Sequence, residues 1–111
     1  MKNFLAIYLG SADANAIMEI TDAQKFAGME KWMKWATDNA SAIVELGSPL
    51  GKTKKINPDG VSDTKNRMTA YTIVKADSHD EAAKLFLNHA HFTVFPGDSV
   101  EVMECLTIPG M

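Results

Sequence analysis

Three histidines, His79, His89 and His91, are the side chains of this sequence best suited to acid–base chemistry. A neutral imidazole can accept or release a proton near pH 7. We single out His91 as a candidate catalytic residue, because it follows an expected helix and would lie at one end of the expected sheet. The alternative is a structural role, in which the ring satisfies backbone carbonyls at the end of the helix.

Four other side chains are expected to line a barrel interior if the strand faces are assigned correctly: Tyr8, Tyr71, Glu101 and Met103. A carboxylate among apolar groups is a natural acid or base, which makes Glu101 a second candidate catalytic residue. The alternative is that Glu101 pairs with a lysine or lies at the rim. The two tyrosines and Met103 are candidate ligand contacts.

Trp32 is a further candidate ligand contact, and Trp35 lies on the same expected helix. Two tryptophans on one short helix are unusual in a chain with 8% aromatic residues. The alternative is that they pack the helix against the sheet or against a partner subunit, because tryptophan is mainly a large packing residue. Cys105, the only cysteine, cannot form an internal disulfide, and we expect it to be a small buried hydrophobe.

Neither a metal nor a cofactor is predicted. His89 and His91 would need a third ligand with convergent geometry, and the sequence has no C-x-x-C or H-E-x-x-H spacing. The segment Gly47–Gly51 lacks the Lys-Ser ending of a phosphate-binding loop and a following helix.

The elements that must position these side chains are clearest in the second half of the chain. Residues 67–76 alternate as a strand, with Met68, Ala70, Thr72, Val74 and Ala76 on one face and Thr69, Tyr71 and Ile73 on the other. Ser78 and Glu81 form a capping box that predicts a helix running to Ala90. Pro96–Gly97–Asp98 predicts a turn into a strand over residues 99–106.

The first half repeats this pattern more loosely. Residues 1–9 read as a central strand that is apolar on both faces, and residues 14–20 are compatible with a turn of helix. Thr21 and Gln24 form a capping box for a helix that begins near Asp22. We expect its buried stripe to consist of four side chains: Phe26, Met29, Met33 and Ala36. Residues 42–47 and 52–56 follow as strands. Residues 52–65, with four lysines, should form a solvated hairpin, and the alternative is an anion site.

Both halves therefore read β-α-β, with a hairpin between them. This pattern predicts an α+β fold, the ferredoxin-like split βαβ with an inserted hairpin, in which an antiparallel sheet carries two helices on one face. At 111 residues we expect one domain over residues 1–111. The other sheet face would still carry apolar groups, and a second copy is the simplest cover for them. We therefore predict a homodimer joined through the sheet face.

Composition limits the classes of partner. The formal net charge of −3 gives no reason to expect nucleic acid, which binds basic surfaces. No apolar run is long enough to span a bilayer, so no membrane association is expected. The N-terminus lacks a secretory pattern, which makes the cytoplasm the expected location.

Several motifs resemble the YCII-related proteins, which include the DGPF-domain group, over nearly the whole chain. They are MKNFLAIYLG, KWMKWA, ELGSPLGKT, YTIVKADSHDEAAKLF and HAHFTVFPGDSVEVMEC. The resemblance implies a dimeric α/β barrel, in which two ferredoxin-like sheets face each other. Val61-Ser62 after Asp59-Gly60 replaces the Pro-Phe of the family name. The histidine that some members pair with an aspartate in the N-terminal half is absent, so that dyad is not carried over.

Two functions stay open at this point. The first is a small dimeric α/β-barrel protein that binds a small organic molecule in an apolar cleft and performs cofactor-free acid–base chemistry. The second is a non-catalytic interaction or accessory module that uses the same dimer as a scaffold. A cavity that touches His91, Tyr71 or Glu101 would favour the first.

Overall fold

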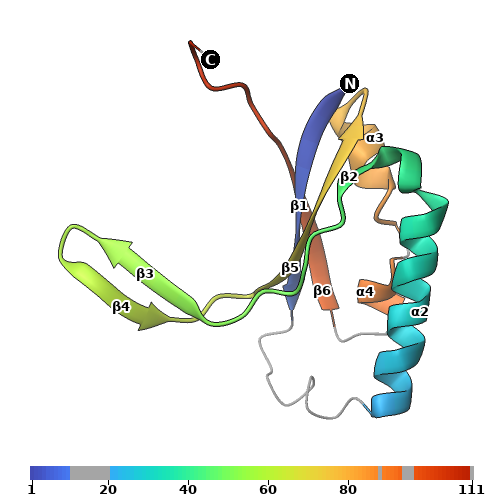
Figure 1. Ribbon diagram of the computed structural model, residues 1–111, viewed down its shortest axis with the longest axis horizontal. Coiled ribbons are helices and arrows are strands. Elements are labelled where there is room, and N and C mark those ends of the chain that lie inside the picture. Colours follow the sequence, from blue (N-terminus) through green and yellow to red (C-terminus); the bar gives the residue numbers. More distant parts are fainter. Residues whose placement is uncertain (11–20, 88, 94–96, 111) are drawn as a thin grey trace.

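Four antiparallel strands form the main sheet in a computed structural model that describes residues 1–10, 21–87, 89–93 and 97–110 (Figure 1). The strands are β1 (Lys2–Gly10), β2 (Ile43–Glu45), β5 (Met68–Ala76) and β6 (Gly97–Glu104). Their order in the sheet is β2-β5-β1-β6, which is the ferredoxin-like arrangement of two interleaved β-α-β units. The predicted α+β fold is confirmed.

The helices all lie on one face of this sheet (Figure 1). They are α2 (Asp22–Asp38), α3 (His79–Lys84) and α4 (Ala90–Thr93), and the 3₁₀ turn η1 (Ala40–Ala42) links α2 to β2. Among the described helices, none is both long and apolar enough to cross a bilayer. The turn of helix suggested for residues 14–20 lies outside the described residues, as does Pro96 of the predicted turn before β6.

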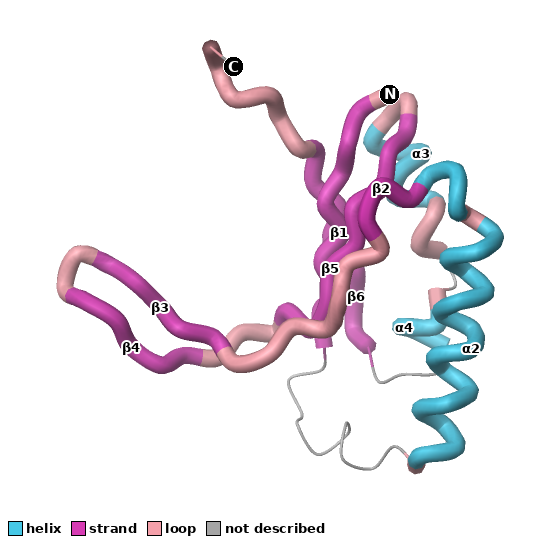
Figure 2. The backbone as a smooth tube through the Cα atoms, in the orientation of Figure 1, coloured by secondary structure: helices cyan, strands magenta, loops and turns pink. Residues whose placement is uncertain are grey.

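The inserted hairpin consists of β3 (Thr53–Asn57) and β4 (Gly60–Thr64), which form a two-stranded sheet of their own. Figure 2 shows this hairpin projecting from the side of the main sheet that faces away from the helices. Of its ten strand residues, only Thr53 is even partly buried. The predicted solvated hairpin is therefore confirmed as a structural element.

Strand alternation decides which side chains reach the helices. In β1, Phe4, Ala6 and Tyr8 are buried beneath the helices, whereas the intervening leucines and isoleucine are half-buried on the other face. In β5 the buried set is Thr72, Val74 and Ala76. The two faces assigned to residues 67–76 from the sequence are correct, because a strand reverses its side chains at every residue.

The capping box at the start of α2 is confirmed: Gln24 N donates to Thr21 Oγ1, and Thr21 N donates to Gln24 Oε1. The predicted buried stripe of α2 is wrong. Three of its members, Phe26, Met29 and Met33, are about half or more exposed, and only Ala36 is partly buried.

The helix instead turns a neighbouring face to the sheet, with Gly28 buried and Trp32 and Trp35 packed on the core. Trp35 Nε1 donates to the backbone oxygen of Leu85 at 2.6 Å. These three positions follow the helical spacing of a core-facing stripe. The large indole rings occupy the space over the sheet, which leaves the methionines at its margin.

The second predicted helix is broken. It ends as α3 at Lys84, and the next amides bond three residues back, as from Leu87 N to Lys84 O and from His89 N to Phe86 O. The chain then restarts as α4. This tightened stretch exposes Leu87 and turns His89 and His91 inward.

Candidate functional site

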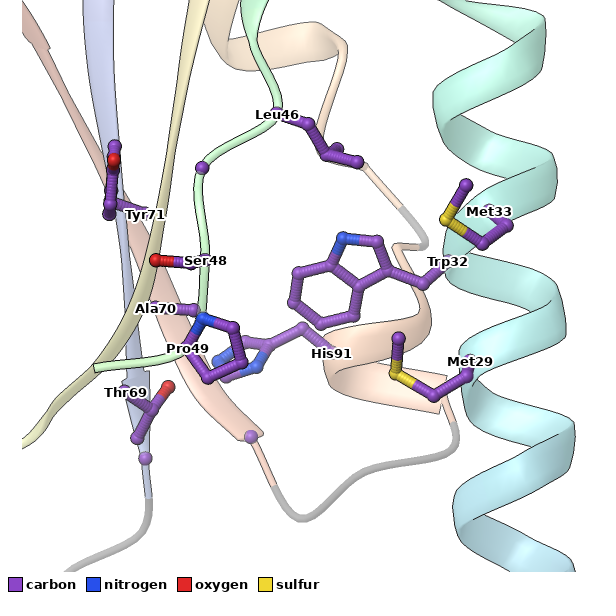
Figure 3. A pocket seen from close by; sticks show the side chains of 13 residues that line it. Met29, Trp32, Met33, Leu46, Ser48, Pro49, Thr69, Ala70, Tyr71 and His91 are labelled. Atoms are coloured by element: carbon purple, nitrogen blue, oxygen red, sulfur yellow. The ribbon is translucent and has the colours of Figure 1, made fainter. Parts of the chain in front are cut away.

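A cavity of about 320 Å³ lies between α2 and the end of the sheet near Gly10 (Figure 3). Its walls come from five parts of the chain. They are Gly10 of β1, Met29, Trp32 and Met33 of α2, residues 46–49 after β2, Thr69, Ala70 and Tyr71 of β5, and His91 and Gly97 near the start of β6. The surface is mainly apolar, with His91, Ser48 and Thr69 among the few polar side chains. This composition is typical of a small-molecule site.

One wall of the cavity is made by α2. The indole of Trp32 projects from α2 toward the opposite segment, and the thioethers of Met29 and Met33 lie on either side of it (Figure 3). Methionine side chains are flexible and polarizable, so they adapt to ligands of different shape. A flat indole offers a stacking surface for a planar ring.

The opposite wall depends on Gly47, which follows β2. Its φ of 79° is in the left-handed region that favours glycine. A Cβ atom at this position would also overlap the backbone oxygen of Tyr71. Glycine therefore lets the chain pass closely over β5 and places Pro49 across the cavity from α2, where it forms an isolated bridge with Ala70.

His91 is buried and its orientation is fixed by two strands. Its Nε2 lies 2.8 Å from the oxygen of Leu9 and 3.1 Å from the oxygen of Ser99. Carbonyl oxygens only accept, so Nε2 carries the proton and Nδ1 of the neutral ring carries a lone pair. Burial lowers the pKa of His91, while the two carbonyl contacts raise it, and lowering dominates.

The neighbouring Gly97 leaves room for this ring. A Cβ on Gly97 would collide with the Cε1 and Nδ1 atoms of His91. The backbone oxygen of His91 would lie even closer to this Cβ, so glycine at the first position of β6 is required by the close approach of His91 and not by an unusual backbone angle.

His89 is buried beside the site within a cluster of aromatic rings. Its ring centroid lies 4.3 Å from that of Trp32, 4.6 Å from that of Trp35 and 5.2 Å from that of Tyr8. Its Nδ1 accepts a hydrogen bond from the backbone nitrogen of His91 at 3.0 Å. Burial, with a smaller effect from His91, lowers the pKa of His89 from 6.5 to about 4, so the imidazole is neutral at pH 7.

Tyr8 lies behind the cavity wall and is fully buried. Its ring centroid is 4.7 Å from that of Trp32 and 5.3 Å from that of His91. Thr72 Oγ1 donates to Leu46 O at 2.8 Å, so the Tyr8 hydroxyl, 3.0 Å from Thr72 Oγ1, donates to it. Burial raises the pKa of Tyr8 to about 12, which keeps the phenol protonated.

The structure divides the residues predicted for the site into two groups. Trp32 and His91 line the cavity, with Tyr8 in contact behind them. Glu101 and Met103 lie on the opposite face of the sheet, where Glu101 pairs with Ile7 and is exposed. The expected convergence of Tyr8 with these residues does not occur, because Tyr8 pairs with Val100 and the next residue of β6 points the other way.

Tyr71 belongs mainly to the second group. It borders the cavity, but its hydroxyl donates to Glu45 Oε1 at 2.7 Å. Cys105, expected to be buried, is exposed. No three metal-binding side chains gather anywhere in the part of the chain that the structure describes.

Sequence reasoning missed several residues of the cavity. Met29 and Met33 were assigned to the buried stripe of the helix, and Gly97 was read only as part of a turn. Gly47 and Pro49 were considered only within a segment that does not match a phosphate-binding loop. The available signal was Gly-Ser-Pro directly after a strand, since such a break can bend the chain back over a neighbouring strand.

No family model and no curated protein matches this sequence. Among solved structures, the chain is similar to the 5-chloro-2-hydroxyhydroquinone dehydrochlorinase TftG of Burkholderia phenoliruptrix AC1100 in complex with 2,5-dihydroxybenzoquinone. The TM-score is 0.56 and the identity 14%, over 94% of this chain and 93% of that chain. This likeness shows a common fold. The resemblance to YCII-related proteins is supported only at that level.

Proposed function

We propose that this chain binds a small planar organic molecule, of the hydroxylated six-membered-ring class, in the cavity between α2 and the sheet. The observation that carries the proposal is a mainly apolar cavity of about 320 Å³ with a neutral histidine in its wall. That volume suits a ligand of one or two rings. Trp32 would stack on the ring, and Met29 and Met33 would close around its edge.

His91 would act as the proton-accepting group of this site. Its Nε2–H is held by Leu9 and Ser99, so Nδ1 is the nitrogen left to accept a proton or hydrogen bond from a ligand hydroxyl. A lowered pKa keeps the imidazole in its neutral, basic form at pH 7. The chemistry proposed is therefore acid–base chemistry without a cofactor.

The structural neighbour supports the ligand class. TftG is a 5-chloro-2-hydroxyhydroquinone dehydrochlorinase, and its structure was solved with 2,5-dihydroxybenzoquinone. Both of these molecules are single hydroxylated six-membered rings, which is the class of ligand that we propose. We also propose that the chain belongs to the YCII-related family, because several of its sequence motifs resemble that family.

A second copy of the chain is proposed as its partner. The sheet face turned away from the helices, here called the open face, carries seven mainly apolar side chains: Leu5, Ile7, Leu9, Tyr71, Ile73, Glu101 and Met103. An interface of ~800 Å² per subunit is ordinary for proteins. Pairing two open faces would cover the apolar groups and give a homodimer around a two-fold axis.

Calorimetric titration with 2,5-dihydroxybenzoquinone tests the binding site. Ala70 lies on the helix side of β5 and lines the cavity, so Ala70→Phe should fill it and weaken binding by about tenfold or more. The matched control is Met103→Phe, which adds the same ring on the open face and should leave the affinity unchanged. Equal affinities for wild type and Ala70→Phe would contradict the proposed site.

A further inference from the structure

The β3–β4 hairpin, here called the arm (residues 52–65), extends from the main sheet on the side of the open face (Figure 1). It pairs only with itself, through five consecutive residue pairs from Thr53↔Thr64 to Asn57↔Gly60. An isolated two-stranded hairpin is marginally stable in water, so its length calls for a surface that it packs against.

One face of the arm is apolar near the turn. Ile56 and Val61 are directly paired, so their side chains lie together on one face of the ribbon. They are 73% and 68% exposed. The next residue pair on this face, further from the turn, is Lys54 with Asp63, and these two side chains form an ion pair. The Ile56–Val61 pair, here called the apolar rung, therefore lies beside a neutralised charge pair. An apolar patch with a polar border is the pattern of a protein contact surface.

Charge is distributed unevenly between the arm and the rest of the molecule. The arm contains four lysines and two aspartates, whereas the remaining residues contain seven lysines and arginines against twelve aspartates and glutamates. The arm is therefore +2 and the rest of the chain −5. Two carboxylates, Glu45 and Glu101, are exposed at the open face. The arm of one molecule is electrostatically complementary to the body of another.

The open face lies between two projecting segments. The arm extends from one end of the sheet, and residues 105–110 extend on the same side from the other end (Figures 1 and 2). The second segment carries Leu106 and Ile108, which are 76% and 64% exposed. A body seated on the open face would be flanked by apolar side chains at both ends.

We infer that the arm is an intersubunit arm: in a dimer formed through the open faces, it packs with Ile56 and Val61 against the body of the second copy. This inference rests on the proposed dimer and is independent of the cavity and its ligand. A two-fold axis makes each contact occur twice, so both apolar rungs become buried and both basic arms lie against acidic bodies. We identify the partner as a second copy of the chain. This one chain carries both the basic arm and the acidic body, and it exposes apolar side chains on the arm and on the open face.

Sedimentation equilibrium of the full chain tests the inference. Ile56→Glu/Val61→Glu removes the apolar rung and should weaken the dimer by about tenfold or more. The control, Ser62→Glu/Thr64→Glu, adds the same charge to the exposed residues on the other face of β4 and should change the dissociation constant less than about threefold. Ile7→Glu, on the open face, should also weaken the dimer.

The outcomes separate the arm from the rest of the account. Loss of the dimer in Ile56→Glu/Val61→Glu but not in the control supports the inference. If Ile7→Glu disrupts the dimer and the arm variant does not, the dimer stands and the role of the arm is wrong. A wild-type chain that is monomeric at ~100 µM overturns both, and it leaves ligand binding in the cavity unaffected.

Discussion

The two faces of the sheet are built from the same strands but are buried in different ways. On the helix face, Phe4, Tyr8 and Val74 are at most 1% exposed, whereas their open-face neighbours Leu5 and Ile73 are only half-buried. The helices of the chain thus cover one face of the sheet, whereas the other face stays partly exposed. Adjacent residues of one strand therefore lie in different surroundings, a buried core on one side of the sheet and a partly exposed apolar surface on the other.

The two tyrosines illustrate this difference. Both have a raised pKa, but for different reasons. Burial is the main cause at Tyr8, whereas at Tyr71 it is the hydrogen bond to the Glu45 carboxylate. Burial in the core and a hydrogen bond to an exposed carboxylate can therefore raise the pKa of a tyrosine in the same direction for different physical reasons.

The largest effect that we expect comes from the core of the helix face. Phe4→Ala should lower the free energy of unfolding by about 3–5 kcal/mol, because the ring is fully buried and the space it leaves cannot be refilled. Leu5→Ala, its neighbour on the open face, should cost only about 1 kcal/mol in the monomer. Urea denaturation, at a protein concentration that keeps the chain monomeric, compares the two variants. Equal losses in the free energy of unfolding would contradict the difference between the two faces.

Acidification should destabilise the helix face through His89. The folded pKa of about 4 lies below the ordinary value of 6.5, so the unfolded chain binds the proton first. Stability is therefore intact above pH 6.5 and falls as the pH drops toward 4, by ~3 kcal/mol for this group. Urea denaturation across this range should show a shallower slope for His89→Asn. His79→Asn, at an exposed histidine, is the control, and an unchanged slope in His89→Asn would contradict the assignment.

A smaller loss is expected at the backbone crossing that forms the cavity wall. Gly47→Ala should cost about 2 kcal/mol or more, because φ is positive and the new methyl group meets the Tyr71 carbonyl. Gly51→Ala is the matched control, since nothing lies within 4 Å of its added Cβ. Thermal unfolding of both variants measures the difference, and a neutral Gly47→Ala would show that the crossing does not need glycine.

The smallest effect distinguishes the tyrosine hydroxyls. Tyr8→Phe should cost about 1 kcal/mol, because it removes a buried hydrogen bond to Thr72. Tyr71→Phe should leave stability unchanged, since its contact with Glu45 is exposed to water. Chemical denaturation of both variants is the measurement, and a costlier Tyr71→Phe would mean that the open face is more protected than its exposure indicates.

Much of the fold was predictable because it follows from local rules. Period-two alternation assigned both faces of β5, and Thr21 with Gln24 located the start of α2. The orientation of α2 was not predictable, because two neighbouring helix faces are apolar and only packing selects between them. The buried Gly28 marks the chosen face, but a lone glycine is a weak signal in a sequence.

The site was predictable only in part for a related reason. His91 and Trp32 could be selected by residue type, yet their meeting depends on the break after α3, where no proline or glycine stands in the sequence to mark it. The wall formed by Gly47 and Pro49 depends on how the chain crosses β5. Tertiary contacts determine where the chain crosses a strand, and the periodicity of apolar residues in a sequence carries no information about such contacts.

The most direct test of the account is an NMR titration of the wild-type chain with 2,5-dihydroxybenzoquinone. Resonances of the Trp32 indole, the His91 ring and the Met29 and Met33 methyl groups should shift and saturate together. Those of Ile7, Ile73 and Met103 on the open face should not respond. Shifts confined to the open face, or no saturable shift at the cavity, would contradict the claim that the helix side of the sheet holds the ligand site.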